Sequence, residues 1–185
     1  MPREPRALHV VGSLPGEADV QAAALDLDTL FRRHASYVAA VAHRLLGRDD
    51  DVDDTVQEVF LAAVRGLGAV RDPKAVKAWL ARIAVRSARR RLRKRRIRSF
   101  FGLDDPAAYG AMTDPSASPE QKALLGRVYQ VLEGMPVNER IAWALRFVEG
   151  EPLESVATLS GCSLATAKRR ITAASRAIEE AFADG

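Results

Sequence analysis

The residues best suited to bind a ligand are arginines and lysines concentrated in one part of the chain. Between Arg82 and Arg98 there are ten basic residues and no acidic residue. Five arginines follow helical spacing, so that a helix would align them as a stripe along one face: Arg82, Arg86, Arg89, Arg90 and Arg93. The positive charges of such a stripe repel one another unless an anion lies against them, and nucleic acid is the obvious anion. The alternative interpretation is a basic helix face that is simply solvated.

A second candidate binding surface lies near the C-terminus. A short helix is predicted from Pro152 to Leu159, followed by a glycine-bearing turn and by Ser163 as the N-cap of a longer helix. This order is typical of a helix-turn-helix. The apolar stripe of the longer helix leaves small, hydroxyl and basic side chains facing outward: Ala165, Thr166, Lys168, Arg169, Thr172, Ala173 and Arg176. Such side chains suit the DNA major groove, and an ordinary helical hairpin is the alternative.

Acidic residues form a separate cluster. From Gly47 to Phe60 there are six acids and one base, Arg48. These acids could complement a helix N-terminus and stay solvated, or they could form a docking surface for a basic protein partner. Both interpretations stay open at this point.

No residue pattern indicates catalysis. The three histidines, His9, His34 and His43, are far apart, and the single cysteine, Cys162, lacks partners for a disulfide or a zinc site. No nucleophile motif or phosphate-cradling glycine loop occurs. We therefore predict no enzyme activity, no metal and no cofactor. A lone cysteine, and the lack of a secretory signal or a membrane-spanning stretch, favour the cytoplasm.

The elements that must position these residues are predicted to be helices. The chain has 185 residues, 48% hydrophobic and only 6% aromatic, and is rich in Ala, Leu, Arg and Glu. Apolar spacing predicts one helix that ends at Gly47, a second from Val52 to Leu67, and a third from Val76 into the arginine-rich run. Trp79 in the third helix could seal the core or stack an unpaired base, and core packing is favoured.

These patterns predict two small all-α domains joined by a flexible linker. Residues 1–24 are interpreted as a flexible extension, with order beginning near Leu25. Residues 25–98 form a helical bundle, residues 99–119 a linker rich in Pro, Gly, Asp and Ser, and residues 120–183 the helix-turn-helix domain. The start of the second domain, Ser118-Pro119-Glu120, is a helix-start signature.

Several ordered motifs resemble the extracytoplasmic-function (ECF) group of the sigma-70 family of bacterial RNA polymerase sigma factors. The first domain resembles sigma region two at Leu30 to His34, Leu45 to Gly47, Asp54 to Phe60 and Trp79 to Ala84. The second resembles region four at Met135 to Arg140 and at Gly161 to Arg170. The resemblance spans roughly Leu25 to Phe182.

The resemblance implies a protein that binds core RNA polymerase, recognises the minus-thirty-five and minus-ten promoter elements and promotes transcription initiation. Docking on the clamp helices of the largest polymerase subunit is implied for Asp54, Gln57, Glu58 and Phe60. Minus-ten recognition and melting is implied for Trp79, Arg82, Arg86, Arg89, Arg90 and Arg93. Minus-thirty-five recognition is implied for Ser163, Ala165, Thr166, Lys168, Arg169, Arg170, Thr172 and Arg176.

Further partners implied by the resemblance are the polymerase flap, which the second domain would contact, and an anti-sigma factor. The chain departs from the family at Arg86, where Asn is frequent, and at Arg90, where Asp is frequent, so minus-ten base preference is not carried over. The alternative function is a dimeric helix-turn-helix regulator that binds an operator without being a polymerase subunit.

Overall fold

The computed structural model describes residues 17–49, 51–66, 72–101 and 118–183, and every regular element in these ranges is helical. The α-helices are α1 (Glu17–Leu46), α2 (Val52–Gly66), α3 (Val76–Phe100), α4 (Pro119–Gly134), α5 (Val137–Phe147), α6 (Leu153–Ser160) and α7 (Leu164–Ala183). A 3-10 turn, Pro73–Ala75, precedes α3. The prediction of an all-α fold is confirmed, and none of these helices is long and apolar enough to cross a membrane.

The first three helices pack into one bundle because each carries an apolar stripe. In α1 the stripe includes Val38 and Leu45, which are fully buried, and in α2 it includes Val59. In α3 the buried positions Leu80, Ala84, Ala88 and Leu92 recur every four residues, so the small alanines let neighbouring helices approach closely. Each helix of the three contacts the other two.

The second group of helices begins with a well-formed cap. The Ser118 hydroxyl accepts a hydrogen bond from the Gln121 backbone N–H at 3.3 Å, and the Gln121 side chain accepts one from the Ser118 N–H at 2.9 Å. The start signature predicted at Ser118 is thus confirmed. Helix α7 then packs against α4, α5 and α6.

The helix-turn-helix is built from α6 and α7. Gly161, at a φ of +64°, ends α6 in the left-handed conformation that glycine adopts without strain. Ser163 then caps α7, since its hydroxyl accepts a hydrogen bond from the Thr166 backbone N–H at 3.2 Å. The N-cap predicted at Ser163 is confirmed.

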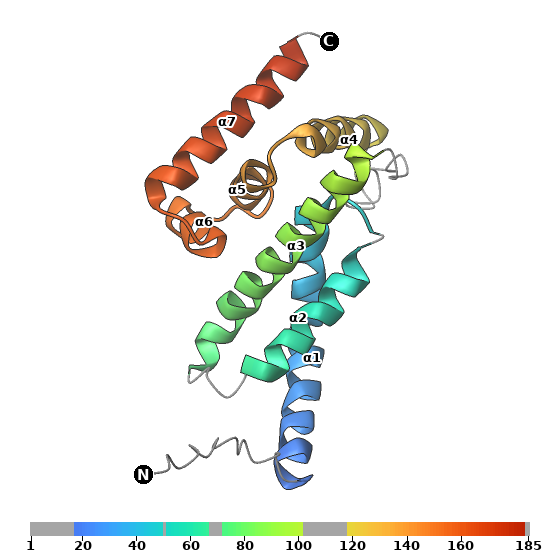
Figure 1. The fold of residues 1–185 in the computed structure, drawn as a ribbon, viewed down its shortest axis with the longest axis vertical. Coiled ribbons are helices and arrows are strands. Elements are labelled where there is room, and N and C mark those ends of the chain that lie inside the picture. The colour runs from blue at the N-terminus through green and yellow to red at the C-terminus, as the bar shows by residue number, and fades with distance from the viewer. Residues whose placement is uncertain (1–16, 50, 67–71, 102–117, 184–185) are drawn as a thin grey trace, which may run out of the picture.

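The two helix groups lie against each other along α3. In Figure 1, α3 runs through the middle of the molecule, and contacts join it to α1 and α2 and also to α5 and α6. Buried residues of both groups, such as Val85 of α3 and Val156 of α6, belong to one continuous apolar cluster. The described structure is therefore a closed arrangement of the two halves.

Two predicted boundaries differ from the structure. Helix α1 begins at Glu17 rather than near Leu25, because residues 17–24 are rich in alanine and the acids Glu17 and Asp19 favour a helix N-terminus. Helix α3 continues to Phe100, two residues beyond the predicted domain end at Arg98. Most of the predicted extension (residues 1–16) and of the linker (residues 102–117) lies outside the described residues.

We predict that replacing Leu45 by Ala destabilises the fold by about 2–5 kcal/mol, because this side chain is fully buried and its removal leaves a cavity. The matched control is Leu61→Ala on α2, whose side chain is 65% exposed and whose loss should change stability by less than about 0.5 kcal/mol. Urea unfolding followed by circular dichroism measures both values. Similar losses for the two variants would contradict the assignment of this core.

Candidate nucleic-acid interface

The exposed side of α7 forms the first candidate surface, which we call the recognition face. It consists of exposed residues on the first four turns: Ala165, Lys168, Arg169, Thr172 and Arg176. Ala167 and Ala174 lie on the opposite side and are fully buried, so packing fixes the rotation of the helix. The remaining predicted residues differ: Ser163 is exposed but serves as the cap, while Thr166 and Arg170 are half-buried.

The α3 arginines form the second candidate surface, which we call the arginine face. Arg82, Arg86 and Arg93 are exposed, and Arg89 between them is half-buried. Arg89 Nη2 donates a hydrogen bond to the Ser160 carbonyl at the end of α6, at 2.8 Å. Burial, followed by the positive charges of Arg170, Arg93 and Arg86, lowers the pKa of Arg89. The arginine face therefore gathers like charges, as the sequence predicted, but the second helix group covers part of it.

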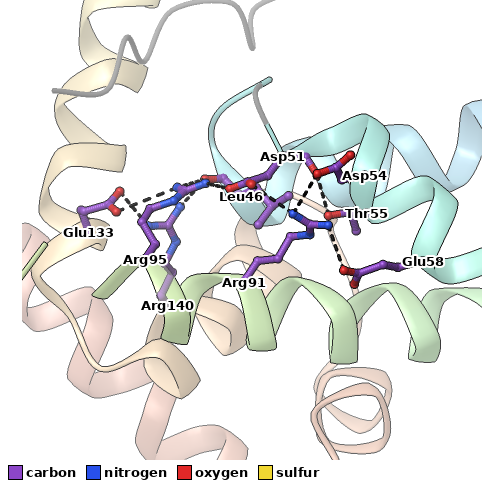
Figure 2. A network of polar contacts seen from close by, with 9 residues as sticks. All are labelled: Leu46, Asp51, Asp54, Thr55, Glu58, Arg91, Arg95, Glu133 and Arg140. Carbon is purple, nitrogen blue, oxygen red and sulfur yellow. Dashed lines mark hydrogen bonds and ion pairs between the residues drawn. The ribbon is translucent and has the colours of Figure 1, made fainter. Parts of the chain in front are cut away.

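Arg90, which was grouped with this stripe, lies elsewhere. Its guanidinium donates to Glu58 of α2 at 2.5 Å, and Arg91 donates to the other Glu58 oxygen at 2.9 Å. Arg91 also approaches Asp51 at 3.2 Å and Asp54 at 3.5 Å (Figure 2). Glu58 was predicted to contact polymerase and Arg90 to contact melted DNA. The structure joins these two side chains in one ion-pair network.

Trp79 packs mainly into the core, in agreement with the favoured interpretation. Its ring is half-buried against the apolar cluster and lies over Gly66 at the end of α2. A Cβ at Gly66 would approach the Trp79 ring carbon Cζ2 to 2.9 Å, so glycine permits this contact. Trp79 precedes Arg82, the first residue of the arginine face, by three residues on the same helix.

Phe60 differs from the docking role predicted for it. The ring is only 5% exposed and packs edge-on against Phe31, with ring centroids 4.8 Å apart. Phe31 is 45% exposed and Leu61 is 65% exposed, so these two side chains, and not Phe60, present apolar surface to solvent. The helical spacing of Phe60 with Val56 and Ala63 places it on the buried stripe.

Sequence reasoning missed two buried arginines. Arg95 of α3 is 6% exposed and Arg140 of α5 is 2% exposed, and both donate hydrogen bonds to the Leu46 carbonyl at the end of α1, at 3.1 Å and 2.6 Å (Figure 2). Arg95 is also bound by Asp51 at 2.6 Å, and Arg140 by Glu133 at 3.2 Å. The acids and the carbonyl compensate two charges that would otherwise be costly to bury.

A signal for Arg95 was present in the sequence. Arg95 follows Leu92 by three residues and Ala88 by seven, so helical periodicity places it on the buried stripe of α3 rather than in the solvated run. Arg140 precedes Ile141 and follows Val137 on a short helix, and nothing in its spacing distinguishes it from an exposed base. Among the described residues, no group of His, Cys, Asp or Glu side chains is arranged to hold a metal ion.

Comparisons with known proteins show which family and which relatives this chain resembles. The family described as Sigma-70 region 2 matches residues 30–97, which span α1 to α3. The ECF RNA polymerase sigma factor SigM of Mycobacterium tuberculosis is 31% identical over 145 residues, covering 77% of this chain and 70% of that protein. The ECF RNA polymerase sigma-E factor of Escherichia coli K12 is 30% identical over 156 residues, covering 80% and 81% respectively.

A solved structure shares the fold. The sigma factor RpoE in complex with the anti-sigma factor NepR from Bartonella quintana superimposes with a TM-score of 0.64 and 22% sequence identity. The superposition covers 85% of this chain and 96% of that chain. Both helix groups therefore have counterparts in one known architecture.

We predict that Asp51→Asn lowers stability at neutral pH by about 1–3 kcal/mol, because Arg95 loses a buried anionic partner. Burial raises the pKa of Asp51, but hydrogen bonds and charges from Arg95 and Arg91 outweigh burial and hold it below its usual range. A carboxyl with a lowered folded-state pKa stabilises the fold above its unfolded pKa of about 3.9, and this contribution disappears as pH falls through the folded value.

The difference between parent and Asp51→Asn should therefore shrink as pH is lowered, measured by chemical unfolding from pH 7 to acid. The control is Asp28→Asn, which removes an exposed ion pair to Arg32 at 3.0 Å and should matter little. A pH-independent difference for Asp51→Asn would show that its charge does not act as described.

Proposed function

Because the chain belongs to the ECF group of RNA polymerase sigma factors, we propose that it divides three binding tasks among three helices. In this proposal α2 docks on core polymerase, the arginine face of α3 holds the melted minus-ten strand, and the recognition face of α7 contacts the minus-thirty-five element. The chain itself contributes binding energy and no catalytic step.

The observation that carries this proposal is the separate orientation of the recognition face. Lys168 and Arg169 are exposed on the second turn of α7, directly after a turn fixed by Gly161 and a cap supplied by Ser163. A helix anchored in this way can enter the major groove with its N-terminal half, where Arg and Lys bind guanine edges or phosphates. Ala165 and Thr172 are small enough to approach a thymine methyl group.

The arginine face suits a different nucleic-acid contact. Arg82, Arg86 and Arg93 are exposed and form no ion pair with another described residue, whereas Arg90 and Arg91 are already paired with Glu58 of α2. Arginines that lie beside a partly exposed Trp79 can hold the phosphates of a single strand while the ring contacts a base. This supports a role in strand holding for three exposed arginines and gives Arg90 a structural role.

Docking on polymerase is assigned to the exposed side of α2. Asp54, with a side chain that is 66% exposed, and Gln57 share the exposed side of α2 with Leu61, which follows Gln57 by four residues. Acids that rim an apolar patch are typical of a surface for a basic and partly apolar partner. Glu58 lies at the edge of this side, where Arg90 and Arg91 each bind one of its carboxylate oxygens.

The operator-binding regulator is not favoured by any observation, since the match to region two covers residues 30–97 and so includes parts of all three helices of the first group. We assign the chain to the cytoplasm, where polymerase and DNA are found. An anti-sigma factor is a further proposed partner, because the RpoE chain that shares this fold was solved with one.

We predict that Arg169→Ala weakens binding to the minus-thirty-five duplex by about 1–3 kcal/mol and relaxes preference at one base pair, if the side chain binds a base edge. Arg86→Ala should leave duplex binding nearly unchanged and reduce strand opening. Both effects are measured with the same holoenzyme, by closed-complex binding and by permanganate reactivity of the melted region.

The matched control for these variants is Arg146→Ala, which removes an exposed arginine from α5. Equal loss of duplex binding in Arg169→Ala, Arg86→Ala and Arg146→Ala, with normal melting in the bound fraction, would reduce the proposed division to general attraction between arginines and phosphates.

We predict that reversing charge at both Asp54 and Glu58 to Lys weakens the complex with core polymerase roughly tenfold or more, about 1.4 kcal/mol. The same charge change at Glu179 on α7 is the control. Because Glu58 also pairs with Arg90 and Arg91, thermal unfolding of each variant must be compared first. A folded double variant that binds core as tightly as the parent would disprove the docking assignment.

A further inference from the structure

The C-terminal end of α3 exposes large apolar side chains that the described core does not use. Phe100 is 86% exposed, Phe101 is 67% exposed, and Ile97, one turn earlier, is 60% exposed. Phenylalanine is mostly buried in folded domains, and several neighbouring exposed apolar side chains mark a surface that binds something. We call these three side chains the aromatic platform.

The two rings of the aromatic platform are held by the last turn of α3. The Phe101 backbone N–H donates hydrogen bonds to the Ile97 carbonyl at 3.3 Å and to the Arg98 carbonyl at 3.1 Å, so this residue caps the helix. The Phe100 and Phe101 rings lie edge-on, with centroids 5.5 Å apart and 87° between their planes. An edge-on contact leaves most of the ring faces open to a ligand.

A hollow of about 640 Å³ adjoins the platform, between the end of α3 and the end of α4. Besides the platform, its lining includes Arg93 and Arg96 of α3 and Glu133 of α4, and Figure 1 shows the last turns of α3 beside α4. The Arg96 Nη1 atom donates a hydrogen bond to the Met135 carbonyl at 3.0 Å, so this guanidinium is fixed at the wall. The hollow thus combines ring faces with positive charge.

The charge around the hollow is positive because its acid is already neutralised. A Glu133 oxygen lies 3.2 Å from Arg140 Nη1 and another lies 3.9 Å from Arg95 Nη1, and both of these arginines are buried. Arg93 and Arg96 are exposed and form no ion pair with another residue in the described ranges. An anion therefore complements this hollow.

An anion that also carries flat apolar faces is a single-stranded nucleic acid. Bases in a duplex stack on one another, whereas an unpaired base can stack on an aromatic ring while arginines hold the phosphates. A simple anion would leave the rings unused, and an apolar protein partner would leave the arginine charges unpaired, although charge is depleted at the centre of protein interfaces. Rings and charge together favour the single strand.

We propose that the aromatic platform, with Arg96, is a base-stacking site for single-stranded nucleic acid at the end of α3. The site binds ring faces rather than base edges, so it accepts unpaired bases without selecting a sequence. It goes beyond the roles proposed above, in which α3 acts through the arginine face and Trp79. It rests on that proposal only for continuity, because Arg93 belongs to the arginine face and also lines the hollow.

The two parts of α3 are far enough apart to be tested separately. Fourteen residues separate Arg86 from Phe100, which is roughly 21 Å along the helix at 1.5 Å per residue. A substitution at one place therefore leaves the side chains at the other place unchanged. This separation lets the base-stacking site and the arginine face fail or succeed independently.

The test compares oligonucleotide binding by variants of the full chain, without polymerase. Replacing Phe100 and Phe101 together by Leu keeps the side chains apolar but removes the ring faces. The matched control is Phe147→Leu on α5, since Phe147 is also an exposed phenylalanine, at 56%. Phe100→Tyr keeps the ring and should bind like the parent. Circular dichroism of each variant verifies that helicity is retained.

The probes are single-stranded DNA, RNA of the same sequence, and abasic DNA, each about ten nucleotides long, within the known range of single-strand site sizes. Fluorescence anisotropy gives their affinities. We expect the double Leu variant to bind DNA or RNA about fivefold or more weakly, the lower limit for one stacked base, with binding of abasic DNA unchanged. The salt dependence should stay the same, because the phosphate contacts remain.

Equal affinity of the parent and the double Leu variant for both single strands would overturn the site and leave the rings to a protein or lipid partner. An equal loss on abasic DNA would also overturn it, since the rings would then not act on bases. Arg86→Ala distinguishes this outcome from failure of the proposed function, because it should weaken binding of all three probes alike. If only the ring variant has an effect, the arginine face is wrong and the base-stacking site stands.

Discussion

The carbonyl end of α1 is the constraint on which the arrangement of both helix groups depends. Two guanidinium groups, from Arg95 and Arg140, and one hydroxyl, from Tyr129, meet its last turn. Carbonyls at a helix C-terminus carry partial negative charge, and burial strengthens their attraction for a cation. Because the donors come from α3, α4 and α5, this one helix end fixes the position of elements from both halves of the chain. Figure 2 shows the two arginines beside Leu46.

Helical geometry divides the arginine-rich run of α3 into faces with different environments. Successive residues rotate about 100° around a helix, so a continuous basic sequence cannot present all its charges to one ligand. Arg91 and Arg95 are neutralised by acids of the α1–α2 region, whereas Arg86 and Arg93 form no ion pair with any other residue that the structure describes. The small net charge of +4 therefore conceals a strong local field on one side of α3.

The recognition face and the arginine face differ in how far the packing of the two helix groups covers them. Lys168 and Arg169 stay exposed in the closed arrangement, whereas Arg89 is bound to α6. The proposed duplex contact by α7 and the proposed strand contact by α3 therefore use surfaces that differ in exposure.

The sequence by itself determined the helices, the helix-turn-helix and the caps at Ser118 and Ser163, because these depend on periodicity and on residues near in the chain. It also predicted the core role of Trp79 and the charge of α3. Only the tertiary structure decided that Phe60 is buried, that Arg90 pairs with Glu58, and that Arg140 lies under α1. The two arginine contacts join residues 32 or more positions apart, and local spacing carries no information about such distant pairs. The burial of Phe60 depends on which of several similar helix faces packs inward.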